Sequence, residues 1–266
     1  MNSVISHDGT AIAFERSGTG PAVILVGGTL DRHANSQLAA LLAPYYTVFH
    51  YFRRGHGASG NTAPWAFERE CEDLQAIIAA AGGAACVYGS STNGVFALEA
   101  AARGLALTIT KLAVWEPPYI VDDSRPPLPA DYRAQLTTLL AAGRRFDMVE
   151  LFFTHVVGMP AETVAAMRQM PFFAGVAATA HTLIHDAAIV GDMSVPTARM
   201  AAVTTPTLVL NGGEAEWLWI QHGLRQLTAA LPRSQRYTLE GQPHNVDQVE
   251  LAPVLHAFFA SRGSTV

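Results

Sequence analysis

One serine of this chain lies in a sequence that is typical of an enzymatic nucleophile. Ser91 occupies the run Val-Tyr-Gly-Ser-Ser-Thr-Asn-Gly at 87–94, between a β-branched and aromatic segment and a helix-forming stretch at 95–103. In the G-x-S-x-G pattern, a tight turn between a strand and a helix exposes the serine hydroxyl. Asn93 takes the place of the last glycine, but asparagine tolerates left-handed backbone and Gly94 follows directly. The pattern predicts that Ser91 is a nucleophile.

A serine hydroxyl is barely ionised at neutral pH, so it needs a base that a third group orients. The best base is His244, one of ten histidines, which follows the last predicted strand in Gly-Gln-Pro-His-Asn-Val. Two glutamates compete for the role of the orienting acid. Glu116 directly follows a predicted strand that ends at Trp115, and Glu216 lies shortly after a predicted strand that ends at Leu210. An acid at a strand end is prone to burial and needs a partner, which favours Glu116.

Predicted strands and helices alternate along the chain, and these elements must position the candidate site residues. Asp8-Gly9 separates two short strands and predicts an antiparallel hairpin. The unbroken apolar run at 22–26 indicates a central strand that is buried on both faces. The pattern then continues with predicted strands at 46–51, 84–88, 112–115, 207–210 and 236–239, and with predicted helices at 67–81, 220–231 and 249–259. This alternation predicts an α/β fold with a mostly parallel sheet flanked by helices.

One stretch interrupts the alternation and predicts a helical cap. It has helical patterns without a convincing strand, and prolines mark its beginning and its end. We expect a core domain at 1–117, a cap at 118–199 and the rest of the core at 200–266. The cap is rich in methionine and phenylalanine, which favours an apolar, adaptable substrate pocket. We expect Phe152, Phe153 and Phe172 to contact the substrate there.

Composition limits the partners of the protein. The chain has 266 residues, of which 50% are hydrophobic and 15% charged, and its net charge is −5 with Lys111 as the only lysine. This balance argues against nucleic acid as a partner. No apolar run approaches the roughly 20 residues that a membrane span needs, and the first residues do not read as a signal peptide. We therefore expect a cytoplasmic protein with a small apolar substrate, and the sequence is compatible with a homodimer.

The two cysteines, Cys71 and Cys86, lack the spacing of metal ligands. We interpret them as buried apolar residues, and we expect neither a metal nor an organic cofactor.

Taken together, these motifs resemble the α/β-hydrolase family over essentially the whole chain, with a cap between strands six and seven. Gly27-Gly28-Thr29 follows the first buried strand, where the family usually carries His-Gly-x. The resemblance implies that the backbone N–H groups of Thr29 and Thr92 bind the oxyanion of the transition state. It also places Gly28 at the substrate.

A second loop is similar to the D-x-R-G-x-G-x-S loop of the family, over 52–59. Phe52 stands where the family has aspartate. Because this loop is chiefly structural in the family, we expect His56 to be a loop residue. His155, His181 and His185 lie in the predicted cap, and we interpret them as surface or core residues, one of which could line the pocket.

The resemblance also bears on the base and the acid. Family members place the histidine between the last strand and the last helix, as His244 is placed. The commonest acid position, three residues beyond the glycine that ends strand seven, falls on Ala215 when counted from Gly212 and on Glu216 when counted from Gly213. A second solution places the acid directly after strand six, as in haloalkane dehalogenases and zearalenone lactonases. We favour Glu116 on this basis, with Glu216 as the alternative.

The resemblance implies a serine hydrolase that cleaves an ester or lactone through an acyl-enzyme. A dehalogenase or epoxide hydrolase is disfavoured, because both need aspartate at the elbow. Two other readings remain open, because one fold hosts many functions. A lyase or cyclase could use Ser91 and His244 to move protons without an acyl-enzyme, and a ligand-binding protein could keep the pocket without turnover.

Overall fold

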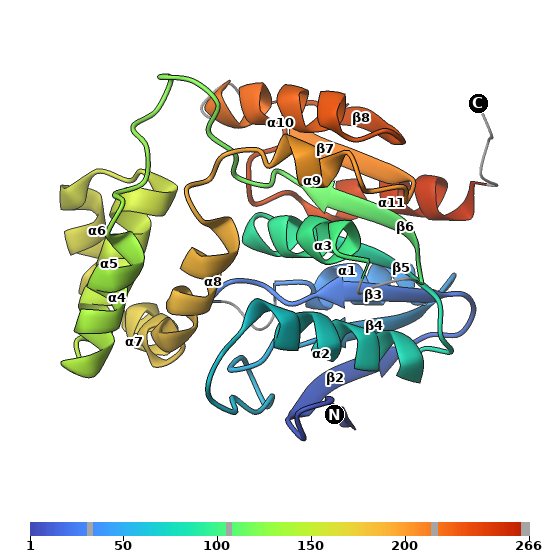
Figure 1. The fold of residues 1–266 in the computed structure, drawn as a ribbon, viewed down its shortest axis with the longest axis horizontal. Coiled ribbons are helices and arrows are strands. Elements are labelled where there is room, and N and C mark those ends of the chain that lie inside the picture. The colour runs from blue at the N-terminus through green and yellow to red at the C-terminus, as the bar shows by residue number, and fades with distance from the viewer. Residues whose placement is uncertain (31–33, 105–107, 214–217, 262–266) are drawn as a thin grey trace.

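The computed structural model describes residues 1–30, 34–104, 108–213 and 218–261, and these form a single mixed sheet with helices on both faces (Figure 1). The sheet has eight strands in the order β1-β2-β4-β3-β5-β6-β7-β8. Their bounds are β1 (Asn2–Ile5), β2 (Ala11–Ser17), β3 (Ala22–Val26), β4 (Thr47–Tyr51), β5 (Ala85–Ser90), β6 (Ile109–Trp115), β7 (Thr207–Gly212) and β8 (Ser234–Leu239).

The predicted sheet is confirmed. β1 and β2 form the antiparallel hairpin around the turn at Asp8 and Gly9, and β2 pairs antiparallel with β4. From β4 to β8 all neighbouring strands are parallel. β3 lies inside the sheet with four of its five residues buried, which explains its unbroken apolar run. The carboxyl ends of β5, β6 and β7 therefore meet at one edge of the sheet.

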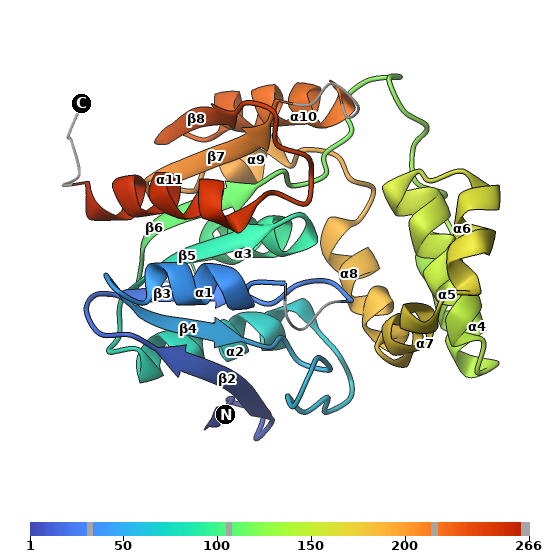
Figure 2. The same cartoon turned by 180° about the vertical axis from the view of Figure 1, so that it is seen from behind.

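Helices cover both faces of the sheet (Figures 1 and 2). α1 (Ser36–Leu42) and α11 (Gln248–Ala260) pack against one face, and α2 (Phe67–Ala80), α3 (Thr92–Ala102), α9 (Thr197–Met200) and α10 (Leu218–Ala230) against the other. The sequence did not predict α1, which is short and whose N-cap residue Asn35 makes no side-chain cap bond. The only lysine stabilises the end of α11, because Lys111 Nζ donates to the carbonyls of Phe258 and Phe259.

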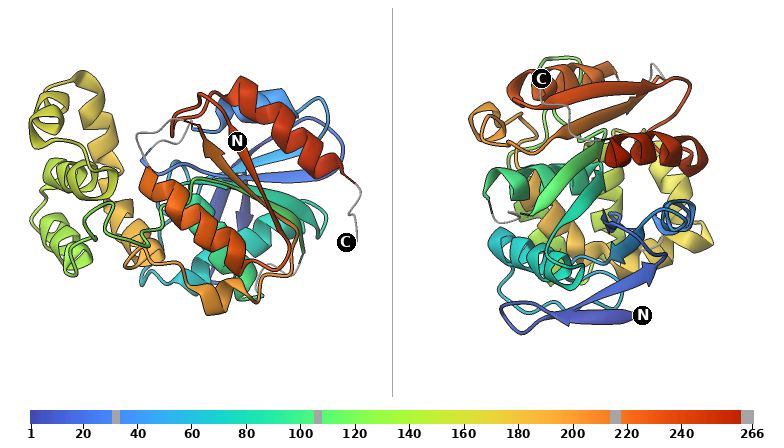
Figure 3. Two further views of the ribbon diagram at one scale, coloured as in Figure 1. Left: turned by 90° about the horizontal axis from the view of Figure 1, so that it is seen from above. Right: turned by 90° about the vertical axis from the view of Figure 1, so that its right-hand side faces the viewer.

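The segment between β6 and β7 is helical and contains no strand among its described residues, as predicted. It consists of α4 (Tyr132–Ala141), α5 (Arg145–Phe152), the π-helical turn η1 (Phe153–Val157), α6 (Ala161–Arg168), α7 (Pro171–Ala178), the 3-10 turn η2 (Ala180–Thr182), α8 (Leu183–Val190) and α9. Helices α4 to α7 stand beside the core as a separate group (Figure 3). They share an apolar core of their own around Leu136, Met148 and Phe173. The domain limits at 118 and 199 stay a prediction.

Within the described residues, no single helix is long and apolar enough to cross a membrane. One bent pair, α7 with the stretch Ala180–Val190, passes the same test of length and composition. Cys71 and Cys86 are both buried free thiols, in α2 and β5. Burial raises the pKa of the Cys71 thiol to about 12, so this residue behaves as a small apolar side chain.

Candidate active site

Ser91 occupies a strained turn between β5 and α3. Its φ of 53° and ψ of −129° lie in a region that residues other than glycine rarely adopt. Backbone hydrogen bonds hold the turn: Ser91 N donates to the Trp115 carbonyl at 2.7 Å, and the Ser91 carbonyl accepts from Gly94 N at 2.9 Å and from Val95 N at 3.2 Å. Gly89 is required here, because a Cβ at this position would lie 2.4 Å from the Asn93 carbonyl oxygen. The predicted strand–turn–helix geometry is present.

The interpretation of Asn93 was wrong in one respect. It does not supply left-handed backbone, because the positive φ belongs to Ser91 and Asn93 lies within the first turn of α3. Its buried side chain instead accepts a hydrogen bond from Arg53 Nη1 at 3.0 Å. A side-chain amide at this position therefore has a contact that glycine could not make.

Glu116 and His244 form a close pair although 128 residues separate them. Glu116 Oε2 lies 2.7 Å from His244 Nδ1, and Glu116 Oε1 accepts a hydrogen bond from Gly212 N at 2.8 Å. Glu116 is 6% exposed and has a φ of 43°, so the chain turns sharply as it leaves β6. Both carboxylate oxygens thus have a partner, which a buried carboxylate requires.

Trp115 links the serine turn to the histidine loop. Its carbonyl accepts from Ser91 N at 2.7 Å, and its indole Nε1 donates to the His244 carbonyl at 2.8 Å. The side chain is completely buried, and Ser90 pairs with Trp115 in the register of β5 and β6. The strand end 115–116 therefore holds the serine and the histidine at the same edge of the sheet.

Replacing Trp115 with phenylalanine is expected to loosen the histidine loop. The variant keeps an aromatic ring but loses the donor to the His244 carbonyl. A small displacement of reacting groups is costly, so the rate of covalent labelling of Ser91 by a fluorophosphonate should fall about tenfold or more. The measurement is the pseudo-first-order labelling rate from intact mass.

Tyr119→Phe is the matched control for this variant. Tyr119 is also a buried aromatic residue, but its hydroxyl has no hydrogen-bond partner in the described part of the chain. Its loss should leave the labelling rate unchanged. Equal rates for Trp115→Phe and the unmodified protein would show that the indole bond does not position the histidine.

Other predicted site residues lie around this edge. Gly28 and Thr29 follow β3, and Thr92 is the first residue of α3. The Thr29 hydroxyl is buried and has no hydrogen-bond partner among the described residues. Glu216, the alternative acid, lies outside the described residues. The catalytic, oxyanion-binding and substrate-binding roles of these residues stay predictions.

The loop after β4 is anchored without the aspartate that Phe52 replaces. Phe52 is buried against the ring of His50, with ring centroids 5.1 Å apart. The Ser59 hydroxyl donates to the Phe52 carbonyl at 2.6 Å, and Arg54 binds the Asp73 carboxylate through two nitrogens. His56 is 5% exposed within this loop. It lies in the loop as expected.

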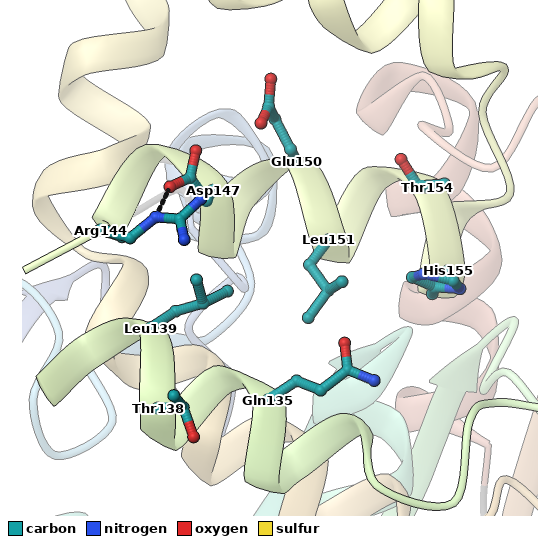
Figure 4. Close-up of a pocket in the computed structure, with 9 residues that line it drawn as sticks. All are labelled: Gln135, Thr138, Leu139, Arg144, Asp147, Glu150, Leu151, Thr154 and His155. Carbon is teal, nitrogen blue, oxygen red and sulfur yellow. Dashed lines mark hydrogen bonds and ion pairs between the residues drawn. The ribbon is translucent and has the colours of Figure 1, made fainter. Parts of the chain in front are cut away.

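The predicted substrate contacts Phe152, Phe153 and Phe172 lie in the cap. Phe152 and Phe153 are partly buried and pack against the cap core, whereas Phe172 is 45% exposed on α7. A hollow of about 500 Å³ lies between α4 and α5, and Figure 4 shows His155 and Leu151 on its wall. All its lining residues belong to the cap, so this hollow is not the site at Ser91.

The other two cap histidines face the core. His181 Nε2 lies 3.1 Å from the Gly55 carbonyl, and His185 stacks on the indole of Trp65 at 5.1 Å between centroids. Burial lowers the pKa of His185 to about 4, against the opposing effect of the Glu70 carboxylate.

Acid is expected to destabilise the fold through His185. In the unfolded chain its pKa is about 6.5, so the unfolded state binds a proton that the folded state rejects. The free energy of unfolding should therefore fall as the pH drops from about 6.5 to about 4, by about 2 kcal/mol from this residue alone. Glu70, Arg53, Asp186 and His56 are the charged and titratable neighbours of the imidazole.

The variant His185→Phe keeps the stack on Trp65 and removes the proton site. The difference in unfolding free energy between pH 7 and pH 4.5, from urea titration, should shrink by about 2 kcal/mol. His7→Phe is the control, because the His7 side chain is 84% exposed. An unchanged pH dependence in His185→Phe would contradict the buried neutral imidazole.

The described residues contain no group of three or more histidine, cysteine, aspartate or glutamate side chains that could hold a metal ion. Arg53 and Trp115, which contact the turn and the loop of the site, were not predicted as site residues. The neighbouring arginines at 53 and 54 could have pointed to Arg53. No signal pointed to Trp115 except its position beside Glu116.

Comparison with known proteins agrees with this geometry. Residues 22–254 match the model of the Alpha/beta hydrolase family. An alpha/beta hydrolase from Sphaerobacter thermophilus is 53% identical to this chain, with a TM-score of 0.90 over 97% of this chain and 100% of that chain. The comparison with curated proteins finds no match.

Two more distant structures share the fold. A thermophilic esterase from Thermogutta terrifontis is 22% identical, with a TM-score of 0.68 over 97% of this chain and 96% of that chain. A meta-cleavage product hydrolase from Pseudomonas fluorescens is 16% identical, with a TM-score of 0.66 over the same shares. At these identities the likeness concerns the fold alone. The family match over most of the sequence, together with the serine turn, establishes that the chain belongs to the alpha/beta hydrolase family.

Proposed function

We propose that this protein is a serine hydrolase that cleaves a carboxylic ester or lactone of a small apolar substrate through an acyl-enzyme. Ser91 is the nucleophile, His244 the base and Glu116 the acid that orients the base. The N–H groups of Thr29 and Thr92 bind the oxyanion. The reaction as proposed needs no metal and no organic cofactor.

The observation that supports this proposal most strongly is the 2.7 Å contact between Glu116 Oε2 and His244 Nδ1. A carboxylate accepts hydrogen bonds only, so this contact supports a proton on Nδ1 of the imidazole. The lone pair then lies on Nε2, the nitrogen that would accept the serine proton. A buried glutamate that accepts from this imidazole through one oxygen is the arrangement of the Ser-His-Asp/Glu triad.

The mechanism follows from these roles. His244 Nε2 takes the proton of Ser91 Oγ while that oxygen attacks the carbonyl carbon of the substrate. The oxyanion that forms is held by two N–H donors, each worth on the order of 3 kcal/mol in the transition state. The imidazolium then gives its proton to the leaving alkoxide. Water then attacks the acyl carbonyl while the same nitrogen takes its proton, and this proton passes to Ser91 Oγ as the bond to the acid breaks.

The cap supports the apolar class of substrate. Its side chains include Leu139, Met148, Phe153 and Met167, which pack together beside the core. Flexible methionine and large aromatic residues suit an adaptable apolar pocket. The net charge of −5 gives no reason to expect an anionic polymer as substrate.

A fluorophosphonate tests the nucleophile before any substrate is known. We expect one adduct per chain by intact mass, located on Ser91 by peptide mapping, and no adduct in Ser91→Ala or His244→Ala. Release of acid from simple aryl esters should follow the same pattern. Circular dichroism of both variants controls for folding.

Each other result assigns the protein to another class. A folded protein that stays unlabelled would contradict the serine hydrolase and favour a lyase, a cyclase or a ligand-binding protein. Labelling of Ser91 without hydrolysis of any aryl ester or lactone would support Ser91 as a nucleophile but contradict the proposed substrate class.

A further inference from the structure

One buried arginine connects the cap to the turn that carries the serine. Arg53 lies in the loop after β4 and is 1% exposed. Its Nε and Nη2 bind both oxygens of Glu70 in α2, at 2.6 and 2.8 Å. Its Nη1 binds Asp186 Oδ1 in α8 at 2.7 Å and Asn93 Oδ1 in α3 at 3.0 Å. One guanidinium thus joins four segments of the chain.

The two bonds of Nη1 reach the parts of the molecule that must meet around a substrate. Asn93 lies two residues after Ser91, in the first turn of α3. Asp186 lies in α8, the helix that leads from the cap back to the core and packs against α3 and α2. Figures 1 and 2 show α8 between the cap helices and the core helices.

We propose that Arg53 is a positioning residue that holds the serine turn and the returning cap helix in a fixed relation through Asn93 and Asp186. The effect of Arg53 on catalysis rests on the proposed function, in which Ser91 is the nucleophile. Arg53 itself is buried, and its guanidinium nitrogens bind Glu70, Asn93 and Asp186.

The charges around Arg53 favour this role over a general contribution to the core. Glu70 already neutralises the guanidinium with a bidentate bond and also accepts from Trp65 Nε1 at 2.7 Å. Asp186 is therefore a second, additional carboxylate. Its other oxygen, Oδ2, is buried and has no hydrogen-bond partner in the described structure. The bond that Asp186 makes to Arg53 is thus the hydrogen bond that holds this carboxylate.

The geometry of Nη1 makes the two contacts depend on each other. A guanidinium is planar and presents its donors in fixed directions. The bond to Glu70 and the ring of Phe96, 5.4 Å from Arg53 Cζ, set the plane. A shift of α8 that moves Asp186 must then break the bond to Nη1 or turn the plane, and turning it would disturb Asn93.

Two variants separate the two contacts without leaving Arg53 unpaired. Asn93→Ala removes the link to the serine turn, and Asp186→Ala removes the link to the cap, while Glu70 remains bound in both. The readouts are the maximal labelling rate of Ser91 by an alkyl fluorophosphonate, kinact, the apparent affinity for the probe, KI, and hydrogen exchange of the α8 amides.

In Asn93→Ala we expect kinact to fall about tenfold with KI within twofold of the unmodified protein; tenfold corresponds to about 1.4 kcal/mol. In Asp186→Ala we expect α8 to exchange about tenfold faster, and KI for a long-chain probe to rise with a smaller fall in kinact. Asp186→Asn keeps an oxygen that can accept from Nη1 and should restore most of both values.

Arg199→Met is the matched control. Arg199 binds Glu99 of α3 from α9, so it also joins α3 to the end of the predicted cap, but its side chain is 56% exposed. We expect kinact, KI and α8 exchange within twofold of the unmodified protein.

Three results would overturn the inference: unchanged kinact and exchange in both alanine variants, an equal loss in Arg199→Met, or no rescue by Asp186→Asn. If the unmodified protein is not labelled at Ser91, the proposed function fails, and exchange in α8 then decides the inference by itself.

Discussion

Replacing Glu116 with glutamine is expected to lower the rate of aryl ester hydrolysis by on the order of a thousandfold to ten-thousandfold. Glu116 accepts two hydrogen bonds, from Gly212 N through Oε1 and from His244 Nδ1 through Oε2. An amide has one oxygen, so it can satisfy only one of these two donors. If the oxygen remains with Gly212 N, the amide nitrogen faces Nδ1, and the imidazole must carry its proton on Nε2. In that tautomer His244 cannot take the proton of Ser91.

The measurement is kcat for an aryl ester beside the labelling rate of Ser91 by a fluorophosphonate, with circular dichroism to confirm folding. Glu216→Gln is the comparison, because the sequence leaves both glutamates as candidates for the acid. We expect this variant to keep kcat within about threefold, because Glu116 already contacts Nδ1 of His244. A large loss in Glu216→Gln with a mild one in Glu116→Gln would reverse the assignment. Mild effects in both variants would show that neither glutamate is the acid.

The sheet could be predicted because its signal is local. The apolar run of β3 and the turn at Asp8 and Gly9 each lie within a few residues, and both elements form where the pattern places them. α1 was missed because it has only seven residues, its N-cap Asn35 makes no side-chain cap bond, and its first turn has no acidic residue. It is stabilised instead by packing against α11, from the other end of the chain, which no local pattern records.

Those site residues that directly follow a strand could be predicted from the sequence. Ser91 and Glu116 each come at the end of a strand, and the parallel order of β5 and β6 brings them to one edge. The role of Asn93 could not be read in the same way. It depends on Arg53, 40 residues away in sequence, whose burial follows from carboxylates in α2 and α8. The hydrogen bond between Arg53 and Asn93 is therefore visible only in the folded chain.

Gly212→Ala is expected to damage both the fold and the site. A Cβ on Gly212 would lie 1.8 Å from the carbonyl oxygen of Gln242 and 2.8 Å from its carbonyl carbon. These are backbone atoms of the histidine loop, so no rotation of a side chain can relieve the overlap. The loop must move away from β7, which we expect to cost about 3 kcal/mol of unfolding free energy.

The effect on catalysis should be larger than the effect on stability suggests. Gln242 precedes His244 by two residues, and Gly212 N is itself a donor to Glu116. Movement at this point displaces the base from the serine and the acid from the base. Because misplacement of about 1 Å can cost a hundredfold, the labelling rate of Ser91 should fall at least about a hundredfold.

Gly175→Ala is the control that separates the steric overlap of a new Cβ from the general effect of replacing glycine with alanine. Gly175 lies within α7, and a Cβ there would meet no atom within 4 Å. Alanine is the better helix former, so this variant should gain about 0.5 to 1 kcal/mol in stability and keep its labelling rate. Thermal unfolding and labelling of both variants give the comparison. If Gly212→Ala unfolds and reacts as the unmodified protein does, the histidine loop does not rest on the end of β7. The close approach that Gly212 permits would then have no part in holding His244 against Glu116.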